Sequence, residues 1–299
     1  MNSQKHYTAA ISAFVIWGFL SIPLRSLTAF SAGEILYFRI AFSLVVLILI
    51  IALFRKQSLR NDLRLLLSFA PARRWGIISL TLIGGALLTV NWLTFIYIVN
   101  HINVKTASFS YLICPVITAV LGYLMLAERM TRVQWIAVLL CALSCVLIGL
   151  NSTLELGYSF LTAFTYALYL ISQRKNQGFD RMVVLCVQVI FSLLIMTLIY
   201  PWLVDKLPTT LVFYELTFLI AVVFTVLPLF LNLYALNRIN SATIGILMYI
   251  NPIFNFTIAF VVFKENITFI QLLGYLIILG ALVLFNIPYL RKLELLKSR

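Results

Sequence analysis

Apolar runs of about 20 residues recur along the whole chain and are separated by short polar breaks. A helical run of this length crosses the hydrocarbon core of a bilayer, because each residue advances the helix by about 1.5 Å. The pattern therefore predicts an all-α integral membrane protein with ten transmembrane helices. Their expected ranges are 8–27, 34–54, 75–99, 102–126, 132–150, 154–173, 183–203, 212–236, 240–263 and 268–287.

The composition strengthens this prediction. Of the 299 residues, 63% are hydrophobic and only 10% are charged, whereas soluble domains are about 45–50% apolar and about 25% charged. The formal net charge of +13 lies mainly in short loops, so it indicates membrane topology and no nucleic-acid partner. The four cysteines fall inside apolar runs without metal-ligand spacing, and we expect neither a metal nor a cofactor.

The positive charges are distributed unevenly between the two sides. With the N-terminus inside, 17 of the 22 Lys and Arg residues lie in cytoplasmic segments and 4 lie outside. Positive residues favour the cytoplasmic side of a membrane. We therefore expect a multi-pass protein of the bacterial inner membrane with both termini in the cytoplasm.

The chain matches itself when it is shifted by 137 positions. Ten of the 38 residues from 97 to 134 are identical to the residue 137 positions later, where about three identities are expected by chance. The identical residues are Tyr97, Asn100, Ile102, Asn103, Thr106, Ile113, Pro115, Glu128, Thr131 and Gln134.

This shift moves the third to fifth helices onto the eighth to tenth, and a shift by an odd number of helices inverts the second half. We predict two inverted five-helix repeats, 1–150 and 151–299, in a single membrane domain. Alternating-access transporters use such repeats, because exchanging the conformations of the two halves opens one central site to opposite sides. The alternative is a duplication that serves folding alone.

Four segments resemble a known family. They are GEILYFRIAFS (33–43), LIGGALLTVNWLTFIYIVN (82–100), YLICPVITAVLGYLMLAERMTRVQWIAV (111–138) and YINPIFNFTIAFVVFKE (249–265). The chain is similar to the EamA family of the drug/metabolite transporter superfamily, in its RarD-type branch. The resemblance implies inverted repeats, a central cavity, and export or exchange of metabolites such as amino acids, or of drugs. It also implies a cavity role for Asn251, whereas Cys114 stands at the corresponding place before Pro115.

Polar and large aromatic residues inside the helices are candidate substrate-binding residues, since facing lipid would waste a hydrogen-bonding group. Arg39 lies near the outer end of the second helix and can bind a substrate carboxylate, line a gate, pair with Glu34 or extend to the headgroups. Amides can instead bond neighbouring helices, and aromatics can form interfacial belts. The predicted substrate-binding residues are Trp17, Arg39, Asn91, Trp92, Tyr111, Tyr166, Tyr249 and Asn251.

Two prolines are predicted hinges. Pro115 and Pro252 fall near the middle of the fourth and ninth helices, where each would free the carbonyl four residues earlier. The alternative is that they are tolerated packing kinks. Glu128 and Glu265 lie at repeat-related helix ends and are expected either to order their loops or to act as gates.

These features favour a secondary transporter that moves a small solute across the bilayer by alternating access. The sequence has no Walker A motif, so ATP is not its direct energy source. It also lacks HExxH and acid-rich motifs, which disfavours an intramembrane enzyme. A membrane receptor or assembly factor remains the alternative function.

The orientation can be tested with reporter fusions. A reporter placed after Arg299 should read as cytoplasmic and one placed after Lys206 as external, because of the uneven distribution of positive charge. A periplasmic C-terminus would contradict the helix count.

Overall fold

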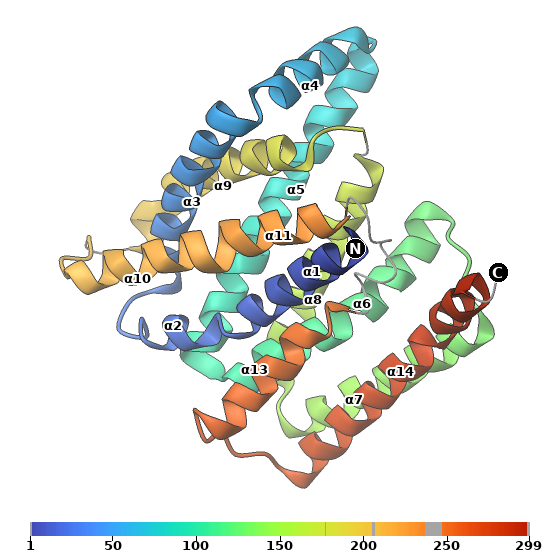
Figure 1. The fold of residues 1–299 in the computed structure, drawn as a ribbon. Coiled ribbons are helices and arrows are strands. Elements are labelled where there is room, and N and C mark those ends of the chain that lie inside the picture. Colours follow the sequence, from blue (N-terminus) through green and yellow to red (C-terminus); the bar gives the residue numbers. More distant parts are fainter. Residues whose placement is uncertain (1, 177, 205–206, 237–246, 298–299) are drawn as a thin grey trace.

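The computed structural model is a bundle of helices, and it describes residues 2–176, 178–204, 207–236 and 247–297 (Figure 1). No strand occurs in these residues. The helical elements are α1 (Asn2–Gly18), α2 (Ser21–Arg25), α3 (Ala32–Phe54), α4 (Lys56–Ser68), α5 (Pro71–Tyr97), η1 (Ile98–Ile102), α6 (Val104–Leu126), α7 (Arg132–Asn151), α8 (Thr153–Lys175), α9 (Arg181–Leu203), α10 (Leu211–Ala221), η2 (Val222–Val226), α11 (Leu227–Leu236), α13 (Ile250–Val261) and α14 (Phe269–Lys297).

The membrane-spanning character predicted from the sequence is confirmed. Eight helical segments of the described chain are long and apolar enough to cross a bilayer. The apolar parts of two further helices are shorter and comprise Arg132–Ile148 in α7 and Ile250–Val261 in α13. All of these segments overlap the predicted ranges, and the start of the predicted helix 240–263 lies outside the described residues.

Helix α4 was not predicted, because it has no long apolar run. None of its residues is buried, and it connects α3 to α5 at one end of the bundle (Figure 1). Its Asp62 carboxylate accepts a 2.9 Å hydrogen bond from the Asp180 N–H, and Asp180 forms a 3.1 Å ion pair with Arg55. Partial burial and then repulsion by Asp180 raise the pKa of Asp62. These contacts tie α4 to the start of α9.

Two connections, separated by 137 residues, have the same backbone geometry. Ala127 and Lys264 both adopt a left-handed conformation with φ of 53°. The next residue in each case donates its N–H to a carbonyl six positions earlier, at 3.2 Å for Glu128 to Gly122 and 3.0 Å for Glu265 to Ala259. This pairing is a helix C-terminal motif that satisfies otherwise free carbonyls.

The helices that follow these connections also start in the same way. At the start of α7, Thr131 and Gln134 exchange side-chain to backbone hydrogen bonds of 2.9 and 3.3 Å. At the start of α14, Thr268 and Gln271 exchange equivalent bonds, both of 3.2 Å. The reciprocal capping box explains why both helices begin there.

Small residues allow close helix packing. Helix α14 lies along α7 (Figure 1), and the Ser144 hydroxyl donates a 2.7 Å hydrogen bond to the Gly274 carbonyl across this contact. A β-carbon on Gly274 would lie 2.9 Å from the Ile148 side chain and 3.5 Å from the Ser144 carbonyl oxygen. Close approach of small residues is a common basis for helix association in membranes.

Replacing Gly274 with valine should therefore push α7 and α14 apart. We expect Gly274→Val to destabilise the protein by about 1–3 kcal/mol, as overpacked interiors do, and thermal unfolding of the purified protein measures the loss. Gly280→Val is the matched control, because Gly280 is in the same helix and a β-carbon there meets nothing within 4 Å. Equal melting temperatures for the two variants would contradict this packing.

Candidate functional site

Arg39 is a buried cation in the interior of the bundle. It is the eighth residue of α3, and only 3% of its surface is exposed. Its Nε donates a 2.9 Å hydrogen bond to the Thr225 hydroxyl, and its guanidinium carbon lies 5.0 Å from the centroid of the Trp92 ring. Its Nη1 is buried and has no hydrogen-bond partner.

No carboxylate among the described residues lies within ion-pair distance of Arg39. The three ion pairs in this part of the chain use Arg25, Arg55 and Arg174. The predicted alternative partner, Glu34, instead accepts a 2.7 Å hydrogen bond from the Ser31 N–H in the capping box that starts α3. Arg39 is thus neither paired with Glu34 nor extended to the headgroups.

The contacts of Arg39 compensate only partly for its burial. Removing a charged group from water costs several kcal/mol even after the protein relaxes. A desolvated cation–π contact returns about 2 kcal/mol, and one hydrogen bond to a charged group returns about 1.5–3 kcal/mol. An anion beside the free Nη1 would supply the missing compensation.

Several predicted residues meet next to Trp92. The buried Asn91 donates a 2.8 Å hydrogen bond from Nδ2 to the Thr162 carbonyl, which fixes its side chain against α8. The Tyr111 hydroxyl donates to Asn91 Oδ1 at 3.4 Å. The centroids of the Tyr111 and Tyr166 rings are 5.7 Å apart. Helices α5, α6 and α8 thus bring an amide and three large aromatic residues together.

Thr225, which accepts the hydrogen bond from Arg39, lies in the π-helical turn η2, which was not predicted from the sequence. Pro228 follows three residues later and has no N–H, so it cannot donate the usual helical bond to the Phe224 carbonyl. Trp17 supplies a donor instead, because its Nε1 lies 3.1 Å from that carbonyl. Turns of this kind are frequent at functional sites. The signal in the sequence was a proline inside a long apolar run.

Tyr249 and Asn251 lie at the start of α13. Asn251 Oδ1 accepts a 2.6 Å hydrogen bond from Asn255, whose own Oδ1 accepts a 2.9 Å bond from the Ser21 hydroxyl. This chain of side chains joins α13 to α2. Tyr249 and Tyr166 both pack against the buried apolar cluster that contains Cys114. The four cysteines are free thiols.

The predicted geometry of the two prolines holds for only one of them. Pro115 is inside α6, as expected. Pro252, in contrast, is the third residue of α13, and the Met248 carbonyl that it was expected to free accepts a 3.3 Å hydrogen bond from the Asn251 N–H. The reason is that a proline is tolerated in the first turn of a helix, where its N–H would have no helical partner.

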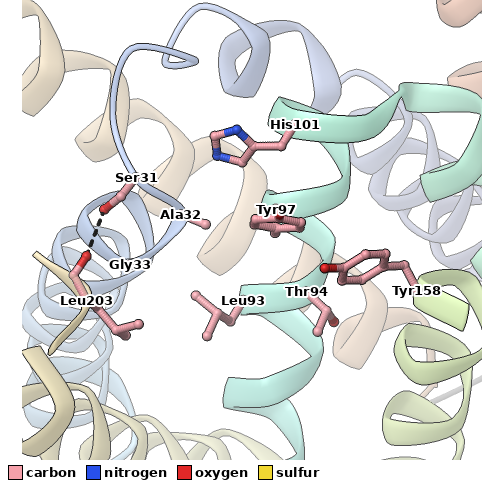
Figure 2. A pocket seen from close by; sticks show the side chains of 9 residues that line it. All are labelled: Ser31, Ala32, Gly33, Leu93, Thr94, Tyr97, His101, Tyr158 and Leu203. Atoms are coloured by element: carbon pink, nitrogen blue, oxygen red, sulfur yellow. Dashed lines mark hydrogen bonds between the residues drawn. The ribbon is translucent and has the colours of Figure 1, made fainter. Parts of the chain in front are cut away.

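A pocket of about 350 Å³ opens between α3, α5, α8 and the end of α9 (Figure 2). Its lining residues are Ser31, Ala32, Gly33, Leu93, Thr94, Tyr97, His101, Tyr158 and Leu203. In Figure 2, Tyr97, His101 and Tyr158 project toward the pocket from one side, and the ring centroids of Tyr97 and Tyr158 are 5.3 Å apart. None of the eight predicted substrate-binding residues lines this pocket.

The pocket adjoins the helices that hold Arg39 and Trp92. Gly33 is on α3, and Arg39 is six residues further along, which is about 9 Å at the rise of an α-helix. Leu93 directly follows Trp92 in α5. Tyr97 was not among the predicted substrate-binding residues, because periodicity reveals the depth of a residue in the membrane and not its neighbours.

Comparison with known proteins identifies the family to which the chain belongs. The fold and these buried polar groups are those of a polytopic helical membrane protein. A model of the EamA-like transporter family matches residues 4–150 and 153–287. The chain therefore belongs to the EamA-like transporter family, within the drug/metabolite transporter superfamily, as its sequence motifs predicted. This membership supports a membrane transporter.

Curated relatives match over nearly their full length. An "Uncharacterized transporter" of Vibrio cholerae is 32% identical over 97% of this chain and 94% of its own length. "Protein RarD" of Escherichia coli is 28% identical over 95% of this chain and 94% of its own. One solved structure, at 13% identity, superposes with a TM-score of 0.64 and covers 97% of this chain and 99% of its own. It shows the fold alone.

The bond from Trp17 to the π-helical turn can be tested directly. Trp17→Phe keeps an aromatic ring but leaves the Phe224 carbonyl without this donor, so we expect a loss of about 1–2 kcal/mol in thermal unfolding. Trp202→Phe is the control, because Trp202 is 81% exposed. If both variants unfold at the wild-type temperature, the Trp17 bond contributes nothing to the turn.

Proposed function

We propose that the protein is a secondary transporter that moves a small metabolite or drug-like solute by alternating access between two inverted five-helix halves, residues 1–150 and 151–299. The observation that carries this proposal is a pair of matching ion pairs at repeat-related positions, one at each end of the bundle. The proposal also includes the bacterial inner membrane as the location and the cytoplasm as the side of both termini.

The element boundaries support the two repeats. Helix α9 begins and ends 149 residues after α3. The capping motifs of α7 and α14 are separated by 137 residues. The difference of 12 nearly equals the 13 residues of α4, which has no counterpart in the second half of the described chain. Insertion of α4 therefore accounts for the change of register.

The helix contacts support the same relation. Helix α8 packs against α5 and α6, and α1 packs against the corresponding α11 and α13. Helices that are each other's counterparts under the exchange also touch, namely α3 with α9, α6 with α13 and α7 with α14. An exchange of the two halves thus maps these contacts onto one another.

The two ion pairs follow this relation. Arg25 lies 3.0 Å from Glu265, and Arg174 lies 2.5 Å from Glu128. The glutamates are 137 residues apart and the arginines are 149 residues apart, which are the two shifts given above. The α6–α7 and α13–α14 connections that carry the glutamates lie at opposite ends of the bundle (Figure 1).

Ion pairs of this kind suit reversible gates. The Arg174 and Glu128 side chains are 46% and 44% exposed, and exposed pairs contribute only about 0–1 kcal/mol, so thermal motion can break them. Glu265 is less exposed and also accepts hydrogen bonds of 2.7 and 3.0 Å from the N–H groups of Val104 and Lys105. Opening the bundle at one end then breaks the ion pair at that end and keeps the ion pair at the opposite end.

The proposed solute site comprises Arg39, Asn91, Trp92, Tyr111 and Tyr166. Trp17, Tyr249 and Asn251 support it from α1 and α13, and Pro115 and Pro252 remain proposed hinges. Family membership points away from an intramembrane enzyme. A receptor or assembly factor is the alternative, and solute flux separates it from a transporter.

Flux into proteoliposomes tests the proposal. Vesicles containing the purified protein and loaded with unlabelled amino acids and organic acids should accumulate a labelled member of the mixture by counterflow. Glu128→Gln and Glu265→Gln should each slow exchange severalfold, because one end loses its gate, and Glu128→Gln should change stability by less than about 1 kcal/mol.

Glu215→Gln is the control for these variants, because Glu215 is an exposed acid away from both pairs. Wild-type exchange in both gate variants would refute the role of the ion pairs. A folded protein that moves none of the solutes would favour the receptor alternative.

A further inference from the structure

We propose that the transported solute carries a carboxylate and that Arg39 binds this carboxylate beside Trp92. The inference rests on the proposed function and deepens it, since it assigns the chemical class of the solute. The Arg39 site is defined here as Arg39, Trp92, Thr225 and Tyr111.

The charge of Arg39 has no counterpart in the described interior. Only 3% of the surface of Arg39 is exposed. The ion pairs of the described residues use other arginines. The Arg39 side chain contacts Trp92 and Thr225, and both are neutral. A site that holds an unpaired cation in a low-dielectric interior selects an anionic ligand, because the ligand completes the charge balance.

The geometry of the guanidinium favours a carboxylate. Arg39 Nε is occupied by Thr225, while the buried Nη1 has a free donor. A planar guanidinium presents its donors in a fixed fork that matches the oxygens of a carboxylate. The contact with Trp92, 5.0 Å from the guanidinium carbon to the ring centroid, and the bond to Thr225 hold the guanidinium in place before the ligand arrives.

The neighbouring rings indicate the rest of the solute. Tyr111 and Tyr166 are half-buried aromatic residues beside Asn91, and the Tyr111 ring also lies 5.4 Å from that of Phe95. Such walls suit a flat or apolar group. Asp62 lies in α4, outside the membrane-spanning helices, and the other described carboxylates lie near helix ends, so a cationic solute has no acid to bind beside these rings.

The pocket of Figure 2 provides a way in. It lies at the start of α3 and beside the last turns of α5, the helices of Arg39 and Trp92, and Leu93 in its wall directly follows Trp92 in the chain. His101 at its edge is exposed. A small carboxylate that enters here would reach Arg39 by moving about two turns along α3.

Four probes of one shape test the charge preference of the full-length protein in detergent. They are 3-phenylpropanoate, L-phenylalanine, 3-phenylpropylamine and 3-phenylpropan-1-ol, and their binding is followed by thermal shift and by tryptophan fluorescence. One or both of the carboxylates should raise the melting temperature by mass action, whereas the amine and the alcohol should not. The two carboxylates distinguish a plain acid from an amino acid as the source of this group.

Two substitutions then locate the site. Arg39→Gln should weaken carboxylate binding by about tenfold or more, and Arg39→Lys, which keeps the charge but not the fork, should weaken it less. Arg73→Gln should bind like the wild type. Arg73 is a matched control because it also stacks on an aromatic ring, 4.1 Å from the centroid of Phe69, but is exposed.

Three results would overturn the inference. They are no binding of either carboxylate at about 10 mM, equal binding of amine and carboxylate, and wild-type affinity in both Arg39 variants. The comparison of the four probes needs no substitution, so it decides the matter even if Arg39→Gln fails to fold. Flux separates the two proposals: carboxylate binding without flux contradicts transport alone, and flux of a cation unaffected by Arg39→Lys contradicts the carboxylate site alone.

Discussion

Hydrocarbon offers no hydrogen bonds, so each polar group inside the bundle must find its partner within the protein. Much of the interior obeys this constraint through local contacts. The Thr89, Ser108 and Thr118 hydroxyls donate to the carbonyls four residues earlier at 2.8–2.9 Å. The Trp17 Nε1–H donates to the Phe224 carbonyl, which Pro228 leaves without a helical donor. The free Nη1 donor of Arg39 differs from these groups, because it belongs to a charged side chain. Burial of a charged group costs more free energy than burial of a neutral polar group.

The constraint also connects the centre of the bundle to its ends. The N–H groups at the start of α6 donate to Glu265, and the same helix carries Tyr111 seven residues after Val104. Helix α8 carries Arg174 at its last turn and Thr162, which accepts from Asn91, near its middle. Two of the helices that hold the proposed solute site, α6 and α8, therefore also take part at their ends in the contacts of the ion pairs, and a movement of either helix would couple the two.

Much of this fold was predictable because hydrophobicity alone determines which segments enter a membrane. The apolar runs predicted membrane-spanning helices, and the 137-residue shift paired Glu128 with Glu265, each of which directly follows one of the matching turns at Ala127 and Lys264. Polarity at depth predicted that Arg39, Asn91 and Tyr111 would be interior. Rotation about a helix axis was not readable in such uniformly apolar runs, so the partners of these residues, Thr225 and Thr162, were missed.

Other features escaped because they depend on tertiary contacts. Helix α4 follows an ordinary polar pattern and is held by Asp180, which is distant in sequence. The position of Pro252 in a first turn depends on where α13 starts, which the surrounding apolar run does not mark. The pocket forms from residues of several helices, and no local pattern identifies such a group.

The most direct test of alternating access is a pair of distances measured in one membrane by electron paramagnetic resonance. Spin labels are attached to cysteines introduced at the exposed Ser26 and Asn266 near one ion pair, and at the exposed Arg129 and Lys175 near the other, with the four native cysteines replaced. The account predicts that saturating solute lengthens one distance and shortens the other. Two distances that rise together, or that both stay fixed during measured flux, would contradict it.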